Sequence, residues 1–156
     1  MLTVKAKYAL RAMLDLAHQA AAESGVRRPV FIADIAQRQD IPRRFLENIL
    51  VELKRSGLVV SHRGKHGGYA LARPPEEITF AEVIRISDGP LALAPCASRT
   101  AYKRCDDCPD EATCVLRHIL IEVRDSTAAI LERTTLASAS KLPLDGLTGR
   151  ASAICP

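Results

Sequence analysis

The sequence predicts a mainly α-helical protein with a small β-hairpin, arranged as a winged helix-turn-helix and followed by a long C-terminal helix. Three observations predict this class. Apolar residues recur at helical spacing through most of the first 56 residues. A basic, glycine-rich stretch with the pattern of two short strands comes next. Near the C-terminus, apolar residues return at alternating spacings of four and three.

The first helix is expected over residues 4–22, with Thr3 as its N-cap. The polar residues expected to point outward from it are Lys5, Lys7, Arg11 and Asp15. Gly25 and Pro29 end this pattern and predict a loop.

Two helices that form the helix-turn-helix are expected over 32–39 and 43–56, with Pro42 at the start of the second and Gly57 after its end. The apolar face of the second helix is Phe45, Leu46, Ile49, Leu50 and Leu53. Its outward side chains are Arg43, Arg44, Glu47, Asn48, Lys54 and Arg55.

Residues 58–74 are expected to form the hairpin, because glycines in its turn supply the positive φ angles that a tight turn requires. A short helix over 79–87 follows, with Thr79 as N-cap and Glu82 three residues later. Residues 90–114 are expected to be irregular. The long helix over about 113–135 carries a seam for helix–helix packing, made of Leu116, Leu120, Val123, Thr127, Ile130 and Thr134.

Charge is distributed unevenly along the chain. Residues 1–75 hold 13 Lys and Arg against 6 Asp and Glu, whereas residues 76–156 hold 9 against 12. This difference indicates an anion-binding first half. No run approaches the roughly 20 apolar residues of a membrane span, and charged residues interrupt any signal-peptide core, so we expect a cytoplasmic protein without a membrane partner. No enzymatic nucleotide-binding or nucleophile motif is present, and we expect no catalytic residues.

In a winged helix-turn-helix the second helix of the motif enters the major groove of double-stranded DNA. The base-edge candidates are Arg43, Arg44, Glu47 and Asn48. Phosphate contacts are expected from Lys5, Lys7, Arg43, Arg44, Arg63 and Lys65. Arg63 is also placed to enter a minor groove. The alternatives are a helical domain with an unrelated hairpin and a protein-binding winged helix.

Four cysteines lie in one short window with the spacing Cys96-x8-Cys105-x2-Cys108-x5-Cys114. Thiolates at such spacing can surround one metal centre, so these four are the candidate metal ligands. An iron–sulfur cluster, a zinc ion and a thiol switch without metal are all compatible with the pattern. A small oxidoreductase using the Cys105-x2-Cys108 pair is disfavoured, because no βαβ pattern surrounds the pair. Cys155, near the C-terminus, is expected to be incidental.

Three stretches resemble the Rrf-type winged-helix transcriptional regulators, a family that includes an iron–sulfur regulator, a nitric oxide sensor and a repressor of cysteine metabolism. They are KAKYALRAMLDLA, the run from IADIAQRQDIPRRFLENIL to RGKHGGYALARP, and the cysteine segment with VLRHILIEVRDSTAAILERTTL. The resemblance covers about residues 2–136 and implies a homodimer that reads a pseudo-palindromic operator. It also implies base reading by Glu47 and Asn48 and minor-groove entry by Arg63. Arg44 departs from the small polar residue of close relatives.

In iron–sulfur members of the family five residues separate the last two ligand cysteines, as they separate Cys108 and Cys114. The family's first cysteine has no counterpart at its usual distance. Arg117 stands where the cluster regulator has a ligating histidine, and His118 lies one position too late. The simplest arrangement is that all four cysteines ligate a 2Fe-2S or 4Fe-4S cluster.

The expected organisation is a DNA-binding domain over 1–78, a cysteine loop and dimerisation helix over 79–136, and a flexible tail over 137–156. The expected function is a transcriptional regulator, acting as a repressor, whose operator affinity depends on a cluster that senses redox, iron or nitric oxide status. The alternative is a cluster-free regulator controlled by a thiol switch or by a protein partner in sulfur metabolism.

Overall fold

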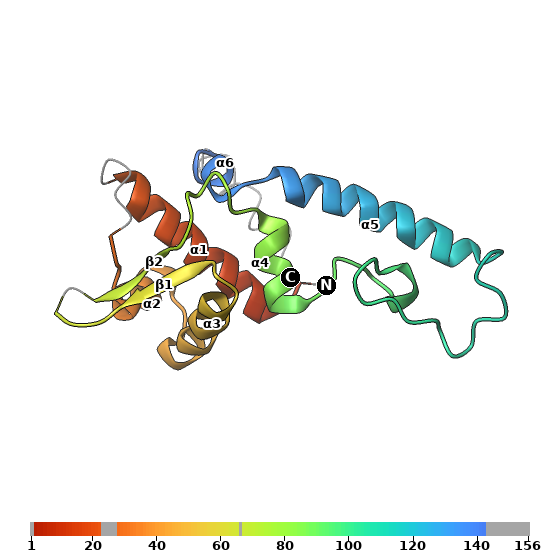
Figure 1. Cartoon of the computed structure of the whole chain (residues 1–156), viewed down its shortest axis with the longest axis horizontal. Coiled ribbons are helices and arrows are strands. Elements are labelled where there is room, and N and C mark those ends of the chain that lie inside the picture. Colours follow the sequence, from red (N-terminus) through yellow and green to blue (C-terminus); the bar gives the residue numbers. More distant parts are fainter. Residues whose placement is uncertain (1, 23–27, 66, 143–156) are drawn as a thin grey trace.

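The computed structural model describes residues 2–22, 28–65 and 67–142. It confirms a mainly helical chain with a two-stranded antiparallel hairpin (Figure 1). The elements are α1 (Val4–Ala22), α2 (Ile32–Gln39), α3 (Arg43–Arg55), β1 (Val59–His62), β2 (Gly68–Leu71), α4 (Phe80–Asp88), the short 3-10 helix η1 (Pro95–Ala97), α5 (Val115–Arg133) and α6 (Leu136–Ser140).

The core lies between α1, α3, α4 and the hairpin. Its largest fully buried side chains include Met13, Leu46, Leu50, Leu53 and Leu58. Thr3 caps α1 as expected, since its hydroxyl accepts a hydrogen bond from the Ala6 amide at 3.2 Å.

Asp15 was expected to point outward, and this is wrong: it is only 4% exposed and forms an ion pair with Arg38 at 2.7 Å. The pair fixes α2 against α1.

The helix-turn-helix follows the predicted bounds of α2 and α3 almost residue for residue. Asp40 ends α2 in the left-handed conformation, at φ 48°, and turns the chain toward α3. Phe45 was placed on the buried face of α3, but it is 40% exposed and packs edge-on against Tyr8, with ring centroids 5.8 Å apart. It therefore lies at the border between the core and the exposed face of the helix.

The hairpin pairs Val59 with Leu71 and His62 with Gly68. It is joined to the segment before α2 through Val30 and Tyr69, which exchange two backbone hydrogen bonds of 2.8 Å. Gly68 is required at this contact, because a Cβ there would lie 2.2 Å from the Val30 carbonyl oxygen. The hairpin is thus fixed to the helix-turn-helix at its base.

The chain after α5 returns to the DNA-binding half. The Phe80 amide donates to the Thr134 carbonyl and the Leu136 amide donates to the Ile78 carbonyl, each at 2.9 Å. The sequence placed the start of the flexible tail at residue 137, but α6 occupies Leu136–Ser140 and buries Ala137. A capping box between Thr135 and Ser138 begins this helix. The remainder of the predicted tail, 143–156 with Cys155, lies outside the described residues.

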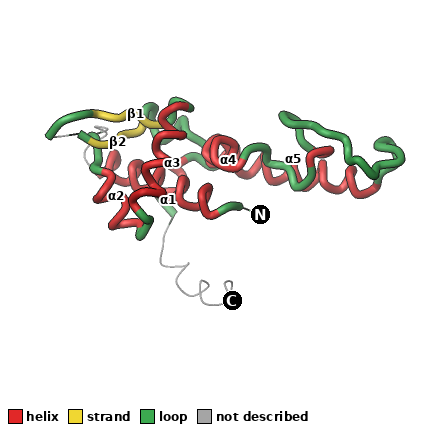
Figure 2. Tube along the Cα trace, turned by 90° about the horizontal axis from the view of Figure 1, so that it is seen from below, coloured by secondary structure: helices red, strands yellow, loops and turns green. Residues whose placement is uncertain are grey.

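Two views show an elongated molecule. The hairpin turn lies at one end, and α5 with the cysteine loop extends to the other end (Figures 1 and 2). The two candidate sites are therefore far apart and are joined by α5.

Candidate nucleic-acid interface and cysteine segment

The exposed face of α3 carries the four side chains predicted to reach base edges. Arg43, Arg44, Glu47 and Asn48 are all exposed, because Leu46, Ile49, Leu50 and Leu53 occupy the opposite face. The Arg43 Nε donates to the Glu47 carboxylate at 3.3 Å, one turn along the helix. This exposed pair contributes little to stability, so both groups remain available to a ligand.

The hairpin turn presents Arg63 and Lys65 to solvent. Gly64 adopts φ 99° in this turn, and its carbonyl accepts the Gly67 amide at 2.9 Å. His66, which the sequence places in the same turn, lies outside the described residues. The Lys54 ammonium group donates to the Ser61 hydroxyl at 2.6 Å and so connects α3 to β1. This hydrogen bond links α3 directly to the hairpin.

The two lysines of α1 differ from one another. Lys7 is exposed, whereas Lys5 is half-buried and forms an ion pair with Glu52 of α3 at 3.2 Å. Lys5 thus joins α1 to α3 within the protein. The other seven predicted contact residues are exposed.

The cysteine segment, residues 95–114, lies along the first half of α5 (Figure 1). All four of its cysteines are free thiols. Cys96 is buried in η1, whereas Cys105, Cys108 and Cys114 are half-buried. In the described part of the chain, no three Cys, His, Asp or Glu side chains are gathered closely enough to hold a metal ion.

Two cysteine contacts are defined. The neighbouring Cys96 thiol is the main cause that raises the pKa of Cys105. Cys114 is the N-cap of α5, where its sulfur accepts the Arg117 amide at 3.4 Å. Arg117 extends its guanidinium back to the Cys96 carbonyl, with its Nε at 3.1 Å. Cys96 therefore lies beside Cys105, and its carbonyl is bound by Arg117, the residue whose amide Cys114 caps.

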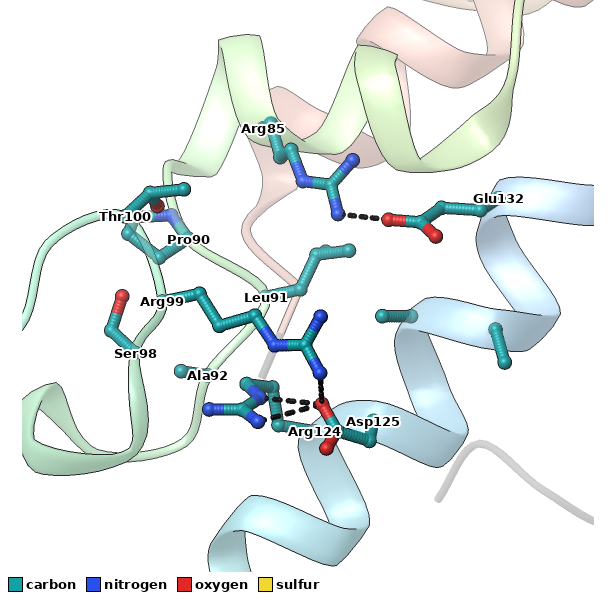
Figure 3. Close-up of a pocket in the computed structure, with 12 residues that line it drawn as sticks. Arg85, Pro90, Leu91, Ala92, Ser98, Arg99, Thr100, Arg124, Asp125 and Glu132 are labelled. Carbon is teal, nitrogen blue, oxygen red and sulfur yellow. Dashed lines mark hydrogen bonds and ion pairs between the residues drawn. The ribbon is translucent and has the colours of Figure 1, made fainter.

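Arg124 and Asp125 form a second point of attachment, shown with the adjacent pocket of about 270 Å³ in Figure 3. The guanidinium of Arg124 contacts the Asp125 carboxylate at 2.7 Å and also donates to the Ala97 carbonyl. Arg99, from the cysteine segment, reaches the same carboxylate oxygen at 3.0 Å. The hydrogen bond from Arg124 is the largest cause of the lowered pKa of Asp125.

Sequence patterns alone do not indicate that Arg117 and Arg124 hold the cysteine segment. Their spacing of seven along α5 was the available signal, but their partners are backbone carbonyls 21 and 27 residues away in the chain. His118 forms an exposed contact with Glu122 at 3.4 Å on its own helix.

No helix among residues 2–22, 28–65 and 67–142 is both long enough and apolar enough to cross a membrane.

Comparison with known proteins agrees with this architecture. Residues 2–141 match the family model of Rrf2, described as an iron-dependent transcriptional regulator. An rrf2-like HTH-type transcriptional regulator of Rhodobacter capsulatus is 45% identical over 136 residues, which are 87% of this chain and 89% of that protein.

Two solved structures share the fold. CymR, the global cysteine regulator of B. subtilis, superposes with a TM-score of 0.71 at 28% identity, covering 90% of this chain and 95% of that one. The IscR structure from T. potens gives a TM-score of 0.68 at 26% identity, covering 100% and 93%. The homologues are transcriptional regulators and not enzymes, which confirms both the winged-helix class and the family expected from the sequence. The chain therefore belongs to the Rrf2 family of DNA-binding transcriptional regulators.

Proposed function

We propose that the chain acts as a homodimer that reads a pseudo-palindromic operator with α3 and the wing, and that an iron–sulfur cluster on the cysteine segment sets its operator affinity. The observation that carries this proposal is the position of α5. Its first half holds the cysteine segment, and its C-terminal end hydrogen-bonds to the strand-like segment between β2 and α4.

The base edges would be read by Glu47 and Asn48, which face solvent near the start of α3. Arg43, Arg44, Lys7 and Lys65 are exposed cations placed for phosphate oxygens. Arg63 at the wing turn would enter the minor groove. Lys5 has a smaller part in this scheme, because Glu52 already neutralises it.

The outer face of α5 supports the homodimer. No residue of this 19-residue helix is buried, and its large exposed apolar side chains are Val115, Leu116, Ile119, Val123 and Ile130. An exposed apolar stripe of this kind marks a protein–protein interface. We propose that a second copy of the chain covers this stripe, since an operator with two half-sites is bound by two DNA-binding domains.

The four thiols support the cluster by their chemistry, because cysteine thiolates are the usual ligands of iron–sulfur centres. Cys96, Cys105, Cys108 and Cys114 would hold it. When bound, the cluster would supply a centre that responds to oxidants, to nitric oxide or to iron supply. The residues of the chain contribute the attachment of Cys96 and Cys114 to α5, so that a change among the thiols acts on this helix.

Backbone hydrogen bonds connect the chain just after α5 to the segment just after the wing. The Ala137 amide donates to the Pro75 carbonyl at 3.1 Å, and the Leu136 amide donates to the Ile78 carbonyl at 2.9 Å. Pro75 and Ile78 follow closely after β2, which is one strand of the wing. A shift of α5 that moves α6 with it would therefore reach the segment that follows the wing.

A thiol switch is the second candidate, and the contact between Cys96 and Cys105 favours it. In this scheme the two thiols form a disulfide and release two protons and two electrons. A peroxide accepts both and is reduced to water or to an alcohol and water. This reaction needs no metal, and it would change the same attachment to α5.

Anaerobic purification with iron and sulfide analysis separates the two candidates. The cluster proposal expects a visible chromophore that Cys108→Ala and Cys114→Ala abolish. If four cysteines ligate, Cys96→Ala and Cys105→Ala also lose it, and if three ligate, one of these two variants keeps it. Cys155→Ala is the matched control and should keep the full spectrum. Wild-type protein without iron would refute the cluster, and the decisive test would then be whether peroxide changes operator affinity.

A further inference from the structure

The turn that carries Cys96 is buried although it belongs to no long helix and to no sheet. Cys96, Ala97 and Ser98 are 7%, 1% and 7% exposed. The remaining three thiols of the segment are half-buried. Something other than regular secondary structure must therefore hold this turn in place.

Two guanidinium groups from one face of α5 hold it. The Arg117 Nε donates to the Cys96 carbonyl at 3.1 Å, and the Arg124 Nη1 donates to the next carbonyl, that of Ala97. The two arginines are seven residues apart, which places them two turns apart on the same side of the helix. They contact adjacent peptide groups of the turn.

Arg124 is itself fixed. Its side chain is only 12% exposed, and Asp125 holds the guanidinium from the other side at 2.7 Å. Arg99 also reaches Asp125, but its side chain is 72% exposed, and an exposed ion pair contributes little. The low exposure of the Arg124 side chain makes it the stronger attachment of the turn to α5.

We infer that Arg117 and Arg124 are positioning residues that fix the Cys96 turn to α5 and keep the Cys96 thiol buried beside Cys105. Without them, two carbonyls of a buried turn lose their donors, and an unpaired buried carbonyl is costly. The turn should then open to solvent. The regulatory meaning of this attachment rests on the proposed function, whereas the attachment itself does not.

The test measures alkylation of each cysteine in reduced, metal-free, full-length protein by iodoacetamide and peptide mass spectrometry. Each rate is divided by the rate of the same cysteine in urea, so that differences in intrinsic thiol reactivity cancel. In the wild type, Cys96 should be protected about tenfold or more relative to Cys108. The Arg117→Ala/Arg124→Ala variant should lower the protection of Cys96 to that of Cys108.

Arg104→Ala is the matched control, because Arg104 also donates to segment carbonyls, those of Cys108 and Pro109, but not to the Cys96 turn. It should leave the protection of Cys96 unchanged. Arg124→Lys keeps the positive charge but lacks the guanidinium that contacts both Asp125 and the Ala97 carbonyl. It should retain more protection of Cys96 than Arg124→Ala does. Equal protection of Cys96 in the wild type and in the double variant would overturn the inference. If the double variant fails to fold, each single variant should lower the protection part of the way, and no change in either would overturn it.

The iron-loaded protein gives a second measurement. If Cys96 is a ligand, the double variant should lose visible absorbance in the same direction as Cys96→Ala, because both changes would release this ligand. Wild-type protein without a chromophore would refute the proposed cluster and leave the alkylation result valid. Unchanged Cys96 protection would refute the positioning role and leave the cluster proposal intact.

Discussion

The DNA-binding half and α5 are stabilised in different ways. In α3, four of 13 residues are buried, and they pack into one continuous core with α1, α4 and the hairpin. In α5, none of 19 residues is buried. The first region is built around this core, whereas α5 exposes apolar side chains along its length. It meets the rest of the chain through Leu131 at the edge of the core, an ion pair between Arg85 and Glu132, and the hydrogen bonds to the Cys96 turn. Under the proposed function, this difference would let the part that senses change more easily than the part that reads DNA.

The sharpest way to test this contrast is to make the same substitution in each region. Leu50→Ala, at a fully buried position in α3, should lower the free energy of unfolding by about 2–5 kcal/mol because it leaves a cavity. Leu116→Ala, at a position 67% exposed on α5, should lower it by less than about 0.5 kcal/mol in the monomer. Urea denaturation followed by circular dichroism, at a protein concentration where sedimentation shows a monomer, measures both. Equal losses would mean that α5 belongs to the same core.

The exposed face of α5 can be tested by adding a charge. Ile130→Asp should place an unpaired carboxylate in the proposed dimer interface, where it would cost several kcal/mol, about 3–5 in comparable buried sites. Sedimentation should show a monomer, and operator binding should collapse because one half-site is no longer read. Ile130→Leu is the control and should remain dimeric. A fully dimeric Ile130→Asp protein would place the interface elsewhere.

At the other end of the molecule, Arg63→Ala tests the wing. Loss of one groove cation should weaken operator binding by about 1–3 kcal/mol and reduce the dependence of log affinity on log salt by about one unit per wing. A salt titration by fluorescence anisotropy measures both quantities. The wing assignment fails if the affinity and the salt dependence are both unchanged.

Glu47→Ala should have the smallest effect on total affinity and the most specific one. A carboxylate disfavours bases from which it cannot accept a hydrogen bond, so its removal should relax the preference at one symmetric pair of operator positions by about 1–3 kcal/mol. Operator selection with the wild type and the variant measures the preference. A uniform loss across all sequences would indicate instead that Glu47 acts through its contact with Arg43.

The elements that could be predicted from the sequence are those set by local signals. Helical periodicity and the Thr3 and Thr79 caps place α1 and α4, and the glycines place the wing turn. The failures depend on partners that are distant in the chain. Asp15 is buried because Arg38 of α2 neutralises it, and no pattern within α1 indicates this.

The residues of the candidate site also divide into those that local sequence patterns predict and those that they do not. The exposed side chains of α3 follow directly from its amphipathic pattern, so Arg44 and Asn48 were placed correctly on the surface. The attachment of the cysteine turn was not predictable, because Arg117 and Arg124 bind carbonyl groups that any residue type would supply. Whether the four cysteines converge depends on the path of an irregular loop, which spacing alone does not determine.

We propose that an iron–sulfur cluster on the cysteine segment, at one end of the molecule, controls DNA binding at the other end. The most direct measurement is the operator affinity of anaerobically purified protein before and after its iron is removed by a chelator, with thiols kept reduced and salt held constant. The account predicts that the two affinities differ by about tenfold or more, which corresponds to about 1.4 kcal/mol of coupling between the sites. Equal affinities of the iron-loaded and iron-free protein would contradict it.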